Sequence, residues 1–200
     1  MNNKNINSII LDNLKSIENK YKAFILDIWG VLWDGIEPYD TAVSTLSSIK
    51  LLKKPVLLLS NAPRRSIVVK NKLTNIGINN KYYDKIISSG EVCRQNFLKN
   101  RDILSQVGSS YYFIGQEDDE KIVENLNLER VRNISKANFL LVCGTRDFSD
   151  KIENYEEELN LGLKYNIPFV CANPDKVVIR KNGDLLICAG KLAEYYSYYG

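Results

Sequence analysis

Apolar runs of strand length alternate with helix-like patterns through the first half of the chain. The apolar runs fall at residues 23–29, 55–61 and 83–89, and apolar residues at helical spacing fill 39–52 and 64–77. This β-α-β-α-β order predicts a parallel sheet with helices on its faces, and therefore an α/β fold.

Polar side chains stand where these three strands are expected to end. Asp27, Ser60 and Ser88 each follow an apolar run. Right-handed crossovers bring the carboxyl ends of parallel strands to one edge of the sheet, and open sheets of this kind bind ligands at that edge. The three side chains are therefore expected to share a ligand-binding edge.

A second α/β unit is predicted from about residue 88, although no Pro/Gly-rich linker marks its start. The Asn-Gly pair at 182–183 predicts a hairpin turn between two short strands. The expected elements are a helix at 88–100, a strand at 109–115, a helix at 117–127, a strand at 138–144, a helix at 150–166, a strand at 168–173 and a hairpin at 176–188.

The residue types at the predicted edge suit phosphoryl chemistry. Asp27 is an anionic nucleophile, and Gly30 allows the chain to turn sharply after it. The hydroxyl of Ser60, the amide of Asn61 and nearby backbone N–H groups suit phosphate oxygens. A cation such as Mg²⁺, which prefers oxygen ligands, would let carboxylate and phosphate approach each other. A strand-terminal Asp is also common as a plain cap or turn residue.

Several motifs carry a resemblance to the haloacid dehalogenase superfamily of hydrolases. They are "FILDIWGVLWDGIEPYDTA", "VLLLSNAPRR" and "IISSGE", with "PFVCANPD" and "CAGKLAEYY" further along. The chain resembles subclass IIA, whose members insert an α/β cap of the C2 type into a Rossmann-like core. The resemblance implies a core at 1–87, a cap at 88–188 and a return into the core at 189–200.

Carried onto this sequence, the resemblance implies a role for each motif residue. Asp27 would be the nucleophile and a Mg²⁺ ligand, and the backbone carbonyl of Trp29 would be the second protein ligand. Ser60 would hold the transferring phosphoryl group of a small phosphorylated substrate, with Asn61 beside it.

In the expected cap, Asn173 and Asp175 of "NPD" would face the substrate. Asn-Pro-Asp is also a good turn former, so a purely structural role for both residues stays open.

Trp29 departs from the superfamily pattern, because phosphatases of the superfamily carry there an Asp that protonates the leaving group. Loss of general acid catalysis typically costs about 10²–10⁴ in rate. Asp34 in "WDG" is a candidate replacement, although it also reads as a turn residue before Gly35. Some uncharacterised members of subclass IIA look similar in carrying Trp at this position.

The third motif Lys and the fourth motif acids of the superfamily are not found before Gly200, so the chain is expected to be truncated. Lys191 stands where the return helix begins and is not expected to be the catalytic Lys. The core sheet is then expected to be incomplete, with an unprotected face or edge that invites a homodimer. A catalytically inactive fragment or binding module is the alternative function.

Composition limits the remaining functions. The chain has 200 residues, no His and a formal net charge of +3, which excludes His-based triads and does not favour nucleic acid. No apolar run approaches the roughly 18 residues of a membrane span, and no phosphate-binding GxGxxG or GxxxxGK[ST] motif follows a strand. Four widely spaced cysteines indicate reduced thiols in a cytoplasmic protein; they are Cys93, Cys143, Cys171 and Cys188.

Overall fold

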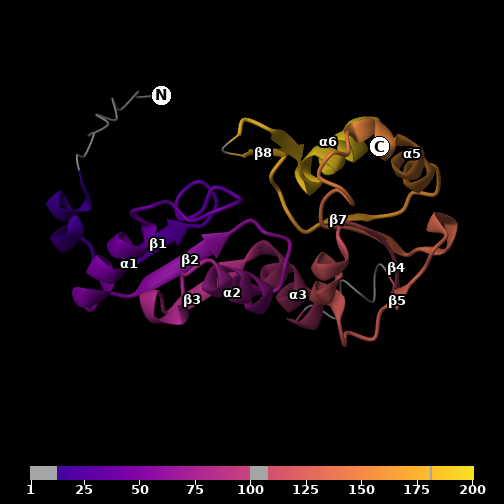
Figure 1. Cartoon of the computed structure of the whole chain (residues 1–200). Helices are drawn as coiled ribbons and strands as arrows, with labels where there is room; N and C mark the ends of the chain where they lie inside the picture. Colours follow the sequence, from indigo (N-terminus) through magenta and orange to yellow (C-terminus); the bar gives the residue numbers. More distant parts are fainter. Residues whose placement is uncertain (1–12, 100–107, 181) are drawn as a thin grey trace, which may run out of the picture.

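Two parallel sheets lie side by side in the computed structural model, which describes residues 13–99, 108–180 and 182–200. In Figure 1 the first sheet lies in one lobe with helices α1 and α2, and the second lies in the other lobe with α5 and α6. The α/β class predicted from the sequence is confirmed. No helix within the described ranges combines the length and apolarity needed to cross a bilayer.

The first sheet has the parallel order β1-β2-β3, with β1 at Phe24–Asp27, β2 at Val56–Ser60 and β3 at Lys85–Ser88. Asp27 lies opposite Leu59, and Ser60 lies opposite Ser88. The register therefore brings Asp27, Ser60 and Ser88 to one edge, as the sequence predicts.

Helices α1 (Ala42–Leu51) and α2 (Ser66–Asn75) contribute to one core with this sheet. Successive right-handed crossovers in a 1-2-3 order place both helices on the same face. The buried side chains of that core include Leu46, Leu58 and Leu73. The strand residues that alternate with the buried ones face the other way.

The opposite face of the first sheet carries exposed apolar side chains. Ile25 in β1 is 66% exposed and Leu59 in β2 is 46% exposed. Parallel strands are usually covered on both faces, so this surface is unusual for its sheet type.

The second sheet has the parallel order β5-β4-β6-β7. Its central strand β6 (Phe139–Val142) is fully buried, which explains its uninterrupted apolar sequence. The other strands are β4 at Ser110–Ile114, β5 at Glu129–Arg130 and β7 at Phe169–Cys171, and the helices around them are α3 at Ser89–Lys99, α5 at Glu156–Lys164 and α6 at Ala189–Tyr199. The two-residue strand β5 is too short to produce a sequence pattern.

Two expected helices differ from the structure. The prediction of an α-helix at 117–127 is wrong: a 3₁₀ segment, η4, covers Glu117–Val123. Asn125 and Asn127 then take left-handed backbone angles, which stop a helix from continuing. The helix predicted from residue 150 begins only at Glu156, because Asp150 accepts hydrogen bonds from Tyr155 and Asp147 in the preceding loop.

Shorter 3₁₀ turns complete the described chain; they are η1 at Leu14–Ser16, η2 at Glu18–Lys20, η3 at Asn80–Tyr82, η5 at Ile134–Lys136 and η6 at Ile152–Asn154. The predicted hairpin is confirmed. It pairs β8 (Val177–Ile179) with β9 (Leu185–Ile187), and Gly183 supplies the positive φ of +87° that its turn requires.

Helix α6 packs on the second sheet. Its Leu192 belongs to the apolar cluster formed with Leu140, Leu159 and Ile167, and the chain ends beside α5 (Figure 1). The division of the chain at residues 88 and 189 into core, cap and returning segment stays a prediction.

Candidate active site

A cleft of about 310 Å³ opens at the carboxyl edge of the first sheet. Its walls come from both sheets, helix α2 and the β8–β9 hairpin. All the residues predicted to form the site line it: Asp27, Trp29, Ser60, Asn61, Asn173 and Asp175. A cleft of this size suits a small metabolite.

Asp27 stands at the last position of β1. Its Oδ1 accepts a hydrogen bond of 2.7 Å from the backbone N–H of Ile28. Gly30 turns the chain away with φ at +78°, a conformation that glycine adopts without strain. On the neighbouring strand, the Ser60 hydroxyl accepts from the Ala62 N–H at 3.2 Å. A carboxylate and a hydroxyl therefore stand at adjacent strand ends and line the same cleft.

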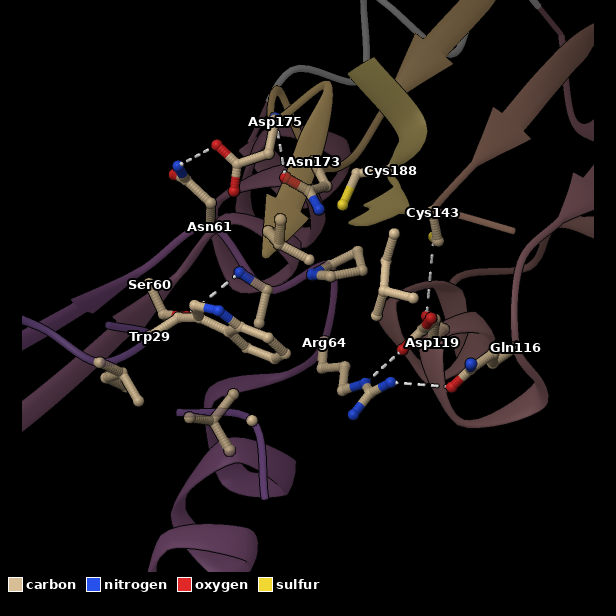
Figure 2. A pocket seen from close by; sticks show the side chains of 18 of the residues that line it. Trp29, Ser60, Asn61, Arg64, Gln116, Asp119, Cys143, Asn173, Asp175 and Cys188 are labelled. Carbon is tan, nitrogen blue, oxygen red and sulfur yellow. Dashed lines mark hydrogen bonds and ion pairs between the residues drawn. The ribbon is translucent and has the colours of Figure 1, made fainter. Parts of the chain in front are cut away.

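The "NPD" turn of the second unit reaches this edge. The side-chain amide of Asn61 donates to Oδ1 of Asp175 at 2.9 Å, as Figure 2 shows. Asn173 is buried, and its Oδ1 accepts from the Asp175 N–H at 3.0 Å. Asn173 therefore shapes the turn, and Asp175 ties that turn to the motif after β2.

Trp29 joins the loop after β1 to the hairpin. Its indole N–H donates to the carbonyl of Ile179 in β8 at 3.2 Å. Its ring makes an edge contact with a second indole, that of Trp33, at an interplanar angle of 67° and with ring centroids 5.2 Å apart. A Cβ at Gly35 would come within 2.6 Å of the Trp29 ring, so the glycine provides room for that ring.

The two alternative candidates from the sequence have other partners. Asp34 is buried, and its Oδ1 accepts 2.8 Å hydrogen bonds from the N–H groups of Ile36 and Glu37, as expected of a turn residue. The ammonium of Lys191 bonds Glu194 on its own helix at 2.7 Å.

Ser88, at the end of the third strand, has a structural contact. Its hydroxyl donates to the Arg64 carbonyl at 2.6 Å and holds the loop that contains Arg64.

The charged residues that join the two units beside the cleft were not predicted from the sequence. Nε of Arg64 lies 2.5 Å from Asp119, and the same guanidinium donates to Gln116 at 3.0 Å (Figure 2). Burial raises the pKa of Asp119, while the charge of Arg64 acts in the opposite direction. These partners are more than 50 residues apart in sequence, so no local pattern identifies them.

Two further basic residues, Lys72 and Arg180, also line the cleft. Lys72 belongs to no recognised motif, and a lysine in helix α2 is expected on the solvent-exposed side of the helix. Arg180 follows β8 in the predicted hairpin, next to the turn, where a charged residue is expected to face solvent. Neither has a signal in the linear sequence beyond its charge.

Oxygen atoms at the edge fit a hard cation. The Asp27 carboxylate lines the cleft, and the Trp29 carbonyl accepts no hydrogen bond from any described residue. Within the described part of the chain, no group of three or more His, Cys, Asp or Glu side chains could hold a metal. An ion here would rely on one carboxylate, one carbonyl, water and ligand oxygens, a set that Mg²⁺ accepts.

Comparison with known structures finds the same fold. A haloacid dehalogenase-like hydrolase from Brucella suis 1330 is 29% identical with a TM-score of 0.83, over 96% of this chain and 70% of its own. A possible sugar phosphatase from Cytophaga hutchinsonii is 21% identical with a TM-score of 0.76, over 96% and 68% of the two chains. No curated protein matches.

A glycerol phosphate phosphatase from Mycobacterium tuberculosis, solved with magnesium, is 19% identical with a TM-score of 0.64. The match covers 91% of this chain and 53% of the phosphatase. A family model for haloacid dehalogenase-like hydrolases matches residues 24–129, which is more than half of the 200 residues. The resemblance seen in the motifs is confirmed, and the chain belongs to the haloacid dehalogenase-like hydrolase family.

Proposed function

We propose that the chain carries the nucleophile and the phosphate-binding residues of a hydrolase for small phosphate monoesters. The supporting observation is that Asp27, Ser60 and Asn61 stand at or directly after adjacent strand ends and line one cleft. Family membership supports the reaction class. Glycerol phosphate phosphatase and possible sugar phosphatase, among the similar structures, act on small phosphorylated compounds by their names.

In the proposed reaction, a carboxylate oxygen of Asp27 attacks phosphorus and the bond from phosphorus to the ester oxygen breaks. The leaving alcohol takes its proton from solvent, and water then cleaves the aspartyl phosphate to free phosphate and Asp27. The Ser60 hydroxyl and the Asn61 amide donate to the phosphoryl oxygens in both steps. Bound Mg²⁺, held by Asp27 and the Trp29 carbonyl, would offset negative charge on the phosphoryl group.

The side chain of Trp29 offers no acid for the leaving group, and its N–H is engaged by Ile179. Esters whose leaving groups are stable without protonation should therefore react best. Aryl phosphates have such leaving groups, so p-nitrophenyl phosphate is the substrate for the first assay.

The test is hydrolysis of p-nitrophenyl phosphate with and without added Mg²⁺. Asp27→Asn is expected to lower kcat by at least about 10³, because removal of a covalent nucleophile leaves only binding contributions. Asp40→Asn, at an exposed position outside the cleft, is the matched control and should keep wild-type activity. Equal hydrolysis rates for the wild type and Asp27→Asn would contradict the proposed mechanism.

A second candidate function is binding without turnover. It is favoured by the engaged indole at the position of the family's acid and by the lack of a three-ligand metal group within the described residues. In that case inorganic phosphate should bind in calorimetry, Ser60→Ala should weaken this binding, and no aryl phosphate should be cleaved.

The proposal includes a cytoplasmic location. All four cysteines are free thiols, and burial raises the pKa of Cys93 and of Cys188 to about 11 in each case. Thiols with raised pKa values react slowly, which suits a reducing compartment.

A further inference from the structure

Lys72 and Arg180 line the cleft from different elements. Lys72 belongs to helix α2, and Arg180 directly follows β8 in the hairpin. None of the ion pairs formed between described residues involves either side chain. Two positive charges therefore face one cleft without carboxylate partners in the described chain.

The acidic groups of the cleft have partners elsewhere. Asp119 is paired with Arg64, and Asp175 accepts from Asn61. Asp27 lies at the strand end, where it accepts from its neighbouring backbone N–H. The acids therefore do not neutralise Lys72 and Arg180 by direct contact.

Aromatic rings hold both cations in place. The Lys72 ammonium lies 4.2 Å from the centroid of the Trp33 ring, and the Arg180 guanidinium carbon lies 4.7 Å from that of Phe148. Both rings line the cleft. Such contacts orient a cation but leave its hydrogen-bond donors available.

Two donors at this end of the cleft are unsatisfied. Nε of Arg180 and the indole nitrogen of Trp33 are buried without a hydrogen-bond partner in the described residues. Buried donors are nearly always bonded in folded proteins, so neither of these two nitrogens has the acceptor that its burial calls for.

The charge of Arg180 also acts on Lys72. The side chain of Lys72 is accessible, yet the surrounding protein desolvates its ammonium and lowers its pKa; Arg64 and Arg180 lower the pKa further, and Asp119 opposes them. Like charges held together repel each other, and a bound anion would relieve this repulsion.

We propose that Lys72 and Arg180 form a second anion-binding subsite, which selects ligands carrying a carboxylate or a second phosphate group away from the Asp27 end of the cleft. The substrate class would then be phosphate esters with an additional anionic group. The reaction on such esters rests on the proposed function, whereas anion binding at the subsite does not.

The Trp29 indole contributes by positioning the hairpin. It bonds the carbonyl of Ile179, the residue immediately before Arg180. The loop that carries the family's catalytic motif therefore fixes the backbone from which Arg180 extends. This bond links the reacting end of the cleft to the proposed subsite.

Intrinsic fluorescence gives a direct test, because both tryptophans of the protein, Trp29 and Trp33, line this cleft. The protein would be titrated without Mg²⁺ with malonate, a dicarboxylate that lacks a phosphoryl group, and with acetate at matched ionic strength. Malonate is expected to give a saturable change at concentrations where acetate does not.

Lys72→Gln and Arg180→Gln should each weaken malonate binding by about tenfold or more, as expected for loss of one charge-assisted contact. Lys70→Gln on the same helix and the exposed Arg132→Gln are the matched controls and should bind as wild type. Lys72→Arg and Arg180→Lys should retain most of the affinity, which separates lost charge from misfolding.

The subsite is refuted if malonate does not bind, or if Lys72→Gln and Arg180→Gln both bind malonate as tightly as the wild type does. In a kinetic arm, 3-phosphoglycerate should exceed glycerol 3-phosphate in kcat/KM by about tenfold, with the ratio falling toward one in both Gln variants. Equal kcat/KM values in the wild type would also refute the subsite. Malonate binding without hydrolysis of any ester would overturn the proposed function and leave the subsite standing.

Discussion

Trp29 acts through its side chain as a connector rather than as an acid. The indole bonds Ile179 across the cleft and packs over Gly35, and its backbone carbonyl accepts no bond from the described residues. With Trp at the position of the family's acid, the side chain supplies no proton to the leaving group. It instead connects the β1 loop to the hairpin through a hydrogen bond. The charged residues beside it are arranged in a similar way, with Arg64 joining the β2 loop to Asp119.

Arg64→Gln is expected to lower the free energy of unfolding by about 3 kcal/mol near neutral pH, because it leaves Asp119 buried without its cation. The side chain of Asp119 is only 4% exposed, and its pKa is already raised by burial. Without Arg64 this pKa should rise further. Stability of the variant should then fall as pH rises through the pKa of Asp119, and the loss should shrink at acid pH, where both states are protonated.

Urea unfolding at a series of pH values measures this effect. Arg130→Gln is the control, because the Arg130–Glu120 pair is more exposed and should contribute about 0–1 kcal/mol. If the loss of unfolding free energy in Arg64→Gln stays constant across the acid range, the premise that Asp119 is ionised beside Arg64 is contradicted.

At the scale of elements, the loops after the strands depend on close backbone packing. Helix α3 begins against the loop after β2, where Gly90 donates its N–H to the Ala62 carbonyl at 3.1 Å. Helix α6 begins in the same manner, with the Gly190 N–H bonded to the Asp175 carbonyl at 2.9 Å. Each helix thus supports a turn that carries predicted site residues.

Gly90→Ala is expected to disturb the loop that carries Ser60 and Asn61. A Cβ at this position would lie 2.4 Å from the carbonyl carbon of Pro63, and backbone atoms cannot give way as a side chain can. The expected loss is about 1–3 kcal/mol of stability, measured by thermal or urea unfolding.

Gly144→Ala is the matched control for stability, since a Cβ there meets no atom within 4 Å and its φ is not in the left-handed region. Unchanged stability of Gly90→Ala would show that the loop after β2 shifts without cost. Inorganic phosphate binding by Gly90→Ala then reports whether Ser60 and Asn61 have moved.

At the scale of the whole molecule, the first sheet is covered by α1 and α2 on one face, while its other face exposes Ile25 and Leu59. The chain spans 70% of the Brucella protein and 53% of the Mycobacterium phosphatase. The activity of the whole proteins and the homodimer expected from the sequence therefore remain proposals for this chain.

Self-association is expected to use the open face of the first sheet. Sedimentation of the wild-type chain should show concentration-dependent dimers, and the double variant Ile25→Lys/Leu59→Lys should shift the chain to monomer, because charged side chains resist burial. Ile67→Lys, at a 51% exposed position on α2, is the control and should dimerise as wild type. A monomeric wild type, or a dimer unaffected by the double variant, would contradict this interface.

Local patterns in the sequence determined the parallel strands of the first sheet, the hairpin and the edge that Asp27 and Ser60 share, because strand alternation and right-handed crossovers follow from short-range rules. They failed at residues 117–127, where Asn125 and Asn127 take left-handed angles and the segment forms a 3₁₀ helix. Roles assigned to Asn173 and Asp175 through the motifs stay predictions, although both residues line the cleft.

Only the tertiary structure decided which distant side chains meet. Asn61 and Asp175 are 114 residues apart, Trp29 and Ile179 are 150 apart, and each pair forms a hydrogen bond across the cleft. Lys72 and Arg180 are likewise far apart in the sequence, and they line the same cleft. Such contacts depend on how the two sheets and the hairpin pack, and packing is set by the summed burial of many apolar side chains rather than by any local run of residues.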